Sequence, residues 1–326
     1  MLKLISSLFI VFIYLFFLSC SHDSSLNVES DKEDVNPYES ITVKDFYGLE
    51  IDRYNPHLQL YDLKNVESIA AQYKESRIKW IFGCGVNYSI LDENMVPVLY
   101  EIPGEVQRNP YQIARYAFSF YQYYFEYKDE KYKKWFLNNV KWLMENCDDN
   151  YYFHYTYKFV HPGTYGGDWI SGMAQGDDLA VFCMAYHLTG DEKYLNYAKN
   201  IFATLYRNSD TLWCFGVDPK GYYWLEEYPN DDFCHVLNGM MLGMWGLWDY
   251  YVITSDKFAL TLFEAGIKSI VDNLSFWKVK GGGIRYCGHY NFNQASYYQI
   301  HLDLFQYYAD FFDIPEFKNI KEYYSK

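Results

Sequence analysis

The chain has 326 residues, 50% of them hydrophobic, so it is long enough to bury one large core or two small ones. Its 42 acidic residues outnumber its 28 Lys and Arg residues and give a formal net charge of −14. This balance argues against a nucleic-acid-binding protein, because contacts with phosphates require a basic surface. Aromatic residues make up 21% of the chain, which suits both a plain aromatic core and a protein that stacks on sugar rings.

The N-terminus has the pattern of an export signal. Lys3 precedes an apolar run over residues 8–18, which is too short to predict a membrane span. A small residue followed by Cys20 predicts a bacterial lipoprotein with lipid attached to Cys20, and ordinary secretion is the alternative. We therefore expect a signal peptide over 1–20, a flexible tether over 21–40 and a lipid-anchored protein of the bacterial cell envelope, periplasmic or surface-exposed.

Residues 41–106 predict a small N-terminal α+β part. A helix is expected near 64–75, followed by strands over 78–82, 87–91 and 96–102. The cysteines that follow Cys20 are irregularly spaced and form no CxxC motif, so no zinc site is predicted. The sequence shows no set of metal ligands, a structural ion stays open, and no cofactor is expected.

The rest of the chain, 107–326, repeats a pair of helices. A short signature with an N-capping Asp or Ser recurs about every sixty residues, a period typical of repeated structural units. Each signature separates an apolar, aromatic-rich run from a helix with Lys and Glu on one face, so the first helix is expected inside and the second outside. The first helices are predicted over 110–127, 176–189, 235–253 and 294–312, and the second over 130–146, 192–207, 256–274 and 316–325.

Strand-like runs lie between the helix pairs. The runs over 213–217 and 222–225 flank a turn, as do those over 276–279 and 284–287, and a single run covers 151–159. Helix pairs with a β-hairpin in each return loop predict a mainly α fold, an incomplete α/α toroid with its hairpins gathered at one end.

Residues suited to proton chemistry follow these hairpins. Glu227 and Tyr228 come after one hairpin, Arg285 and Tyr286 lie in the next, and Tyr297 lies in the helix after that. The toroid would bring them together at one end. Taken singly, each has a plainer interpretation, as a solvated rim or as a hydrogen-bonded core residue. No GxSxG, HExxH or nucleotide-binding glycine motif accompanies them.

Several motifs resemble the C-terminal domain of D-glucuronyl C5-epimerases, which convert glucuronate to iduronate within heparan-type chains. The resemblance is carried by Glu226-Glu227-Tyr228-Pro229 with the following 235–241, by 169–176, by 109–116, and by the spacing of Tyr297 and His301. It spans about 107 to 320, within the predicted repeat of helix pairs.

The resemblance implies a set of site residues. Its catalytic residues would be Glu227, Tyr228, Tyr286 and Tyr297. Its substrate-binding residues would be Arg115, Trp169, Gln175, Asn238, Arg285 and His301. The sequence departs from the family pattern at His289, Tyr298 and Asp303, which bears on the substrate more than on the reaction.

The expected function is therefore a uronate C5-epimerase acting on a glucuronate-containing polysaccharide. Such an enzyme removes a proton alpha to a carboxylate and returns one to the opposite face, which needs two proton carriers. A uronate polysaccharide lyase starts with the same proton removal, and a hydrolase would pair Glu227 with Asp168 or Asp178. A non-catalytic glycan-binding lipoprotein is the alternative outside enzymes.

The partners expected are a uronate-containing glycan and, through Cys20, a membrane; formation of a homodimer stays open. The strong negative charge repels a polyanion unless the site is locally basic. Only a cluster of Arg108, Arg115 and Arg285 could provide that, so a uronate glycan of lower charge is favoured over a highly sulfated one.

Overall fold

The computed structural model describes residues 58–76, 90–102, 105–158, 168–207, 212–229, 233–288 and 295–325. The predicted signal peptide, the tether, Cys20 and the strand predicted over 78–82 lie outside the described residues. So do most of the strand predicted over 87–91 and the family departure at His289.

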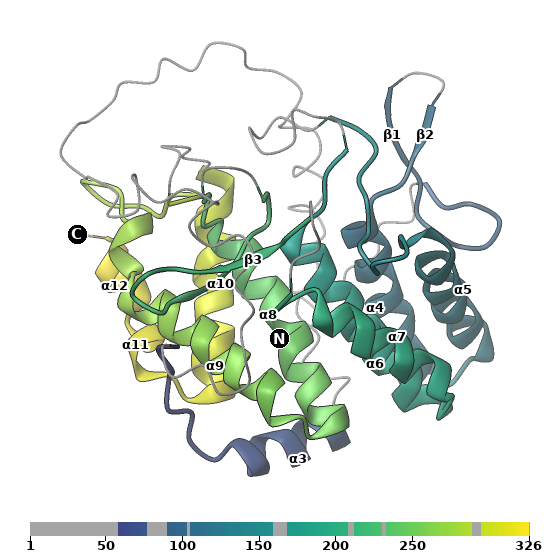
Figure 1. Cartoon of the computed structure of the whole chain (residues 1–326), viewed down its shortest axis with the longest axis horizontal. Helices are drawn as coiled ribbons and strands as arrows, with labels where there is room; N and C mark the ends of the chain where they lie inside the picture. The colour runs from purple at the N-terminus through teal and green to yellow at the C-terminus, as the bar shows by residue number, and fades with distance from the viewer. Residues whose placement is uncertain are drawn as a thin grey trace.

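The described chain is built from successive helix pairs, as predicted. The pairs are α4 (Pro110–Tyr127) with α5 (Glu130–Asn146), α6 (Gly172–Thr189) with α7 (Glu192–Ala203), α8 (Leu237–Thr254) with α9 (Lys257–Asp272), and α10 (Ala295–Phe312) with the short α11 (Pro315–Lys318) and α12 (Ile320–Tyr324). Figure 1 shows the pairs following one another around the molecule, with α6 and α8 in the middle. The fold is therefore mainly α and is that of an α/α toroid.

The capping residues set the helix boundaries. The side chains of Asp129, Asp191 and Asp256 each accept a hydrogen bond from the backbone N–H two residues ahead, at the start of α5, α7 and α9. Ser255, predicted as an N-cap, instead ends α8 in a left-handed conformation with φ 59°. Helix α6 begins at Gly172 rather than at 176, because Ser171 caps it by accepting the N–H of Ala174.

Helices α6 and α8 touch backbone to backbone. A Cβ added at Gly176 would lie 1.9 Å from the carbonyl oxygen of Gly243, and one at Gly246 would lie 2.0 Å from the carbonyl oxygen of Gly176. No side chain fits at these positions. The two helices are buried along nearly their full length, which explains their lack of a polar face.

The hairpins are less regular than predicted. Strands β3 (Phe215–Val217) and β4 (Tyr223–Leu225) pair antiparallel with Gly216 opposite Trp224, as expected. The second predicted hairpin is wrong over 276–279, because Leu274–Trp277 form a 3₁₀ turn and a single bridge joins Lys278 to Ile284. In the single strand-like run, bridges join Cys147 to Phe153 and Tyr155 to Trp169.

The described N-terminal residues form α3 (Val66–Ser76), β1 (Leu99–Ile102) and β2 (Glu105–Gln107). Tyr73 of α3 packs against Trp245 and Trp248 of α8 and edge-on against Phe311 of α10. Helix α3 thus closes one end of the helical core, and β3 lies towards the other end (Figure 1).

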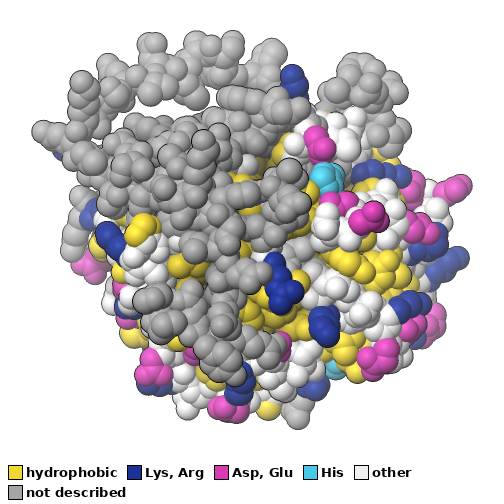
Figure 2. Space-filling view, in the orientation of Figure 1, with side chains coloured by type: hydrophobic (Ala, Val, Ile, Leu, Met, Phe, Trp, Pro, Cys, Tyr) yellow, Lys and Arg dark blue, Asp and Glu magenta, His cyan; other side chains and the backbone are white. Residues whose placement is uncertain are grey.

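The surface carries both signs of charge. On the described part of the face in Figure 2, Lys and Arg side chains alternate with Asp and Glu. Among the described helices, none has both the length and the apolar character that a membrane crossing requires. The cysteines that the structure describes are free thiols, and no cluster of metal ligands occurs among the described residues.

Candidate active site

Three tyrosines from distant parts of the chain lie together at the hairpin end of the core. Tyr228 follows β4, Tyr286 lies in the segment that leads to Cys287, and Tyr297 is in the first turn of α10. Their side chains are 4%, 4% and 6% exposed, respectively. The structure thus brings together the three predicted catalytic tyrosines.

Glu227 joins two of these tyrosines in a chain of polar contacts. The Tyr286 hydroxyl donates a hydrogen bond to Oε1 of Glu227 at 3.1 Å, and the hydroxyls of Tyr228 and Tyr286 lie 3.1 Å apart. The ring of Tyr297 meets that of Tyr286 edge-on, with centroids 4.5 Å apart. A carboxyl group and two phenols therefore form one buried hydrogen-bonded cluster.

The start of α8 holds this cluster in place. The N–H of Leu237 donates to the carbonyl of Tyr286 at 3.2 Å, and Val236 forms a bridge with Cys287. Glu227 packs against Gly239, where an added Cβ would lie 2.1 Å from Oε2 of Glu227. The glycine in the family motif is therefore required by the close approach of the Glu227 carboxyl group.

Burial raises the pKa of Glu227 to about 7, and the neighbouring Glu226 carboxylate raises it as well. Hydrogen bonds from Tyr228 and Tyr286 act in the opposite direction because they stabilise the ionised form. Glu227 can therefore exchange a proton near neutral pH.

The phenols and the nearby imidazole stay neutral. Burial, followed by the charge of Glu227, raises the pKa of Tyr228 and of Tyr286 well above the usual value. Burial lowers the pKa of His301 to about 3, so its ring is uncharged at neutral pH. Its Nε2 lies 3.4 Å from Oδ1 of Asn238, a residue in the first turn of α8.

Of the predicted binding residues, Trp169 also lies in the apolar cluster around the tyrosines. Its ring centroid is 5.5 Å from that of Tyr228, and it stacks on Tyr155 at 3.9 Å. The structure adds two tyrosines that the sequence analysis did not single out, Tyr155 and Tyr157. Side chains two residues apart in a strand point to the same face, so the predicted strand over 151–159 already placed Tyr155 and Tyr157 on one face.

Two predicted binding residues are occupied by contacts within the protein. Gln175 is fully buried, accepts the N–H of Phe153 at 2.9 Å and donates to the carbonyl of Tyr151 and the hydroxyl of Thr204. Arg115 pairs with Asp177 at 3.4 Å. Both side chains thus have partners within the protein, and their roles in substrate binding stay predictions.

The predicted basic cluster is largely neutralised. Arg108 pairs with Asp92 at 2.8 Å, and Arg115 is held by Asp177. Arg285 is half-buried beside Tyr286, and its backbone N–H, rather than its guanidinium group, donates to the carbonyl of Trp277 at 2.7 Å.

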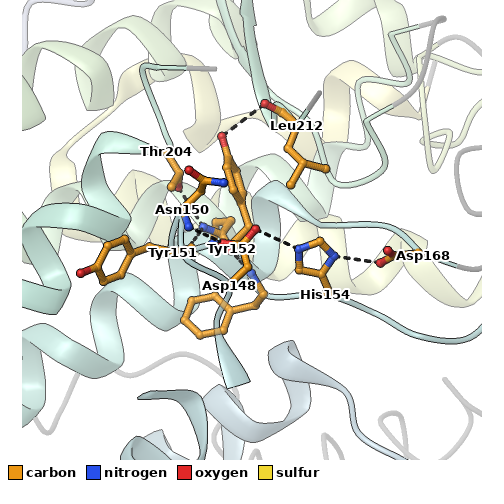
Figure 3. A network of polar contacts seen from close by, with 10 residues as sticks. Asp148, Asn150, Tyr151, Tyr152, His154, Asp168, Thr204 and Leu212 are labelled. Carbon is orange, nitrogen blue, oxygen red and sulfur yellow. Dashed lines mark hydrogen bonds and ion pairs between the residues drawn. The ribbon is translucent and has the colours of Figure 1, made fainter. Parts of the chain in front are cut away.

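The acids considered for hydrolysis differ from each other. Asp168 is 72% exposed and pairs with Nδ1 of His154 at 2.8 Å, while Asp148 contacts Nε2 of the same ring (Figure 3). Asp178 is fully buried on α6, and neither of its carboxyl oxygens has a hydrogen-bond partner.

Comparisons with known proteins place the chain in a family. A family model for the D-glucuronyl C5-epimerase C-terminus matches residues 144–326. An uncharacterized protein of Methanocaldococcus jannaschii is 28% identical over 222 residues, covering 61% of this chain and 72% of the relative. The D-glucuronyl C5-epimerase of Caenorhabditis elegans is 28% identical over 159 residues, covering 43% of this chain but only 26% of that enzyme.

A solved structure shares the fold. Cellobiose 2-epimerase from Bacillus thermoamylovorans superimposes with a TM-score of 0.54 and 11% identity, covering 79% of this chain and 72% of that chain. Identity this low shows the α/α fold alone. Because the family model covers more than half of the chain, this protein belongs to the D-glucuronyl C5-epimerase C-terminus family and, with it, to the carbohydrate epimerases.

Proposed function

We propose that the protein is a C5-epimerase that removes and returns the C5 proton of glucuronate units in a polysaccharide, forming iduronate-type units. The observation that carries the proposal is the buried chain from Tyr228 through Tyr286 to Glu227. The chain connects a carboxyl group that can accept a proton, Glu227, with two phenols that can donate one. The family model that matches the chain is that of an epimerase domain.

The protonation states suggest which group does which task. Glu227, with a pKa of about 7, is substantially ionised at neutral pH and can accept the C5 proton. The raised pKa of Tyr228 and of Tyr286 keeps both phenols protonated, so they suit the donation of a proton to the intermediate. Tyr297, packed on Tyr286, is the alternative donor.

The hydrogen-bonded chain also resets the catalyst. After Glu227 has taken one proton and Tyr228 has given one, the site holds a carboxylic acid and a phenolate. Tyr286 contacts both, so its hydroxyl passes a proton to Tyr228 and receives one from Glu227. Both groups return to their starting forms with no net change in protons.

The intermediate of this reaction is an enediolate, which carries extra negative charge on the uronate oxygens. Each well-placed hydrogen-bond donor lowers such a barrier by about 3 kcal/mol. Asn238 and Arg285 are the candidate donors, because Asn238 precedes Gly239, which packs on Glu227, and Arg285 precedes Tyr286 in the chain. Arg115 is engaged with Asp177.

The arginine contacts favour a substrate of modest charge. Two of the three arginines that could form a basic surface are paired with carboxylates, Arg108 with Asp92 and Arg115 with Asp177. With a net charge of −14, the chain repels polyanions at long range. These facts support a uronate glycan that carries few sulfates.

The test is isotope exchange in heavy water. A glucuronate-containing oligosaccharide incubated with the protein should gain deuterium at C5, detected by mass spectrometry and NMR. Glu227→Gln, Tyr228→Phe and Tyr297→Phe should each slow incorporation a hundredfold or more. Tyr127→Phe is the matched control, because Tyr127 is 57% exposed on the surface.

Other outcomes identify the alternatives. New ultraviolet absorbance from an unsaturated uronate would identify a lyase, and release of reducing ends a hydrolase. Retained glycan with neither exchange nor cleavage, across a range of uronate polymers, would identify a binding protein and overturn the proposal.

We also propose that the protein is anchored to the cell envelope by lipid on Cys20. The support is the charged start and apolar run ahead of this cysteine. Labelled palmitate should enter the wild type expressed in bacteria and should be absent from Cys20→Ser, as measured by gel fluorography.

A further inference from the structure

A second buried acid, Glu226, lies next to Glu227 and is not used in the proposed chemistry. Its Oε1 is 2.7 Å from Nδ1 of His235, and its Oε2 accepts the backbone N–H groups of Cys234 at 3.1 Å and His235 at 3.0 Å. The Glu226 side chain is 0% exposed and that of His235 is 1% exposed. Such a carboxylate is held by three donors in the protein interior.

His235 extends these contacts to the segment that carries Tyr286. Its ring stacks on Trp224 of β4 with centroids 4.0 Å apart. Its carbonyl accepts the indole N–H of Trp277 at 2.7 Å and the N–H of Gly288 at 3.2 Å. The Glu226–His235 pair therefore joins β4, the start of α8 and residues 277–288.

The backbone of Glu226 is fixed on both sides. Its N–H donates to the carbonyl of Cys214, and its carbonyl accepts the N–H of Gly172 at the start of α6, each at 2.8 Å. Glu227 is the next residue along the chain. Its direction relative to Tyr286 is therefore set by the residue before it.

We propose that the Glu226–His235 pair is a positioning element of the active site: it aligns Glu227 and Tyr228 with Tyr286, and it places a second buried carboxylate beside Glu227. This inference rests on the proposed function. Glu226 acts on Glu227 through the backbone that the two residues share and through its negative charge. It is a positioning residue rather than a catalytic one.

The effect of the Glu226 charge on the ionisation of Glu227 can be measured, because few other charged groups act on Glu227. The groups acting on it are Glu226 along the chain, Tyr228 beside it and Tyr286 across from it. Tyr155 and Tyr297 complete the surroundings: the charge of Glu227 acts on Tyr155, and Tyr297 acts on Tyr228 and Tyr286. Among these, Glu226 is the neighbour whose negative charge opposes ionisation of Glu227.

The experiment measures the titration of Glu227 in Glu226→Gln. In protein labelled with ¹³C at the glutamate carboxyl groups, the Glu227 resonance is assigned by its loss in Glu227→Gln. Removing the neighbouring charge should move the Glu227 midpoint to lower pH by about one unit, the scale of shift that a close like charge causes. The limb of the C5-exchange pH profile that depends on Glu227 should move in the same direction. An unchanged midpoint in a folded Glu226→Gln protein overturns the charge effect.

His235 tests the positioning effect. His235→Asn keeps a side-chain donor towards Glu226 and tolerates the left-handed backbone at this residue, which has φ 49°. His235→Ala removes the donor. We expect His235→Ala to lower kcat at least tenfold with KM little changed, and His235→Asn to restore most of that loss. Equal kcat values for the two variants overturn the alignment by His235.

The two failures are distinguishable. The carboxyl titration needs no substrate, so it reports on Glu226 even in a protein without C5 exchange. Absence of exchange in the wild type contradicts the proposed function, whereas exchange in the wild type with an unchanged Glu227 midpoint in Glu226→Gln contradicts this inference. If Glu226→Gln fails to fold, as judged by circular dichroism, the His235 variants decide.

Discussion

Two pairs of acidic residues adjacent in sequence are buried in this protein, and the members of each pair differ in their hydrogen-bond and ion-pair partners. Asp177 and Asp178 lie on α6, and Glu226 and Glu227 follow β4; all four side chains are at most 2% exposed. In each pair one acid has a basic partner: Arg115 lies 3.4 Å from Asp177, and the ring of His235 lies 2.7 Å from Glu226. The second acid of each pair has no such partner.

The second acids differ in their donors. Asp178 accepts no hydrogen bond, and burial raises its pKa well above the usual value, so it stays protonated. Burial also raises the pKa of Glu227, but hydrogen bonds from Tyr228 and Tyr286 hold the rise to about 7. The difference shows that hydrogen bonds from neighbouring phenols limit the rise in pKa that burial causes, so that Glu227 exchanges protons near neutrality.

The largest expected effect comes from removing one of these donors. Tyr286→Phe removes the hydroxyl that contacts both Glu227 and Tyr228, and it deprives the Glu227 carboxylate of one of its hydrogen bonds. C5 deuterium incorporation should fall a hundredfold or more, and the limb of the pH profile due to Glu227 should move to higher pH. Exchange at the wild-type rate would show that the chain of contacts has no part in catalysis.

A substitution at Gly239, which packs against the Glu227 side chain, should have the next largest effect on C5 exchange. Gly239→Ala puts a Cβ 2.1 Å from Oε2 of Glu227, so the Glu227 side chain must leave its present position beside Tyr286 and Gly239. Exchange should fall at least tenfold, with a loss of about 1–3 kcal/mol in the free energy of unfolding, typical of overpacking. In the control Gly288→Ala the nearest atom lies at 3.4 Å, an ordinary contact, and both quantities should change less.

Asp178→Asn should change stability in a pH-dependent way. In the unfolded chain Asp178 ionises near 3.8, whereas in the folded protein it keeps its proton to much higher pH. Unfolding therefore releases a proton, and the wild-type free energy of unfolding falls as pH rises above about 4. Asn has no such loss, so the stability advantage of the variant in urea unfolding should grow as the pH rises above about 4.

Asp177→Asn sharpens this comparison. The folded-state pKa of Asp177 is about 7, because Arg115 opposes the effect of burial. The pH-dependent part of the difference from wild type should therefore level off above about pH 7. A difference that keeps growing at pH 8 and pH 9 would contradict the pairing of Asp177 with Arg115.

The smallest effect is expected for His301→Gln, which should change the free energy of unfolding at acid pH. His301 has a folded-state pKa of about 3 against 6.5 in the unfolded chain, so unfolding takes up a proton and stability is lost as pH falls from 6.5 towards 3. His301→Gln should remove this loss, about 1.4 kcal/mol for each pH unit below 6.5. Thermal unfolding of both proteins at pH 7.5 and pH 5 measures it; identical pH dependence would place a charged His301 in the folded state.

Much of the fold could be predicted because its signals are local. Helix pairs follow from capping aspartates such as Asp129 and Asp191 and from apolar periodicity. The boundaries that were missed depend on other contacts. Ser255 ends α8. Residues 274–277 form a 3₁₀ turn instead of a strand, because the indole N–H of Trp277 donates to the carbonyl of His235, 42 residues away in sequence.

The sequence by itself determined the helix pairs, their inner and outer faces and the family motif that contains Glu227 and Tyr228, because periodicity, caps and motifs are properties of neighbouring residues. Tertiary structure alone decided that Tyr286 meets Tyr228, that Gln175 and Arg115 are taken up by Phe153 and Asp177, and which buried acids receive donors. The reason is that burial and hydrogen bonding depend on segments far apart in the chain, and these two quantities set the proton affinity of each group.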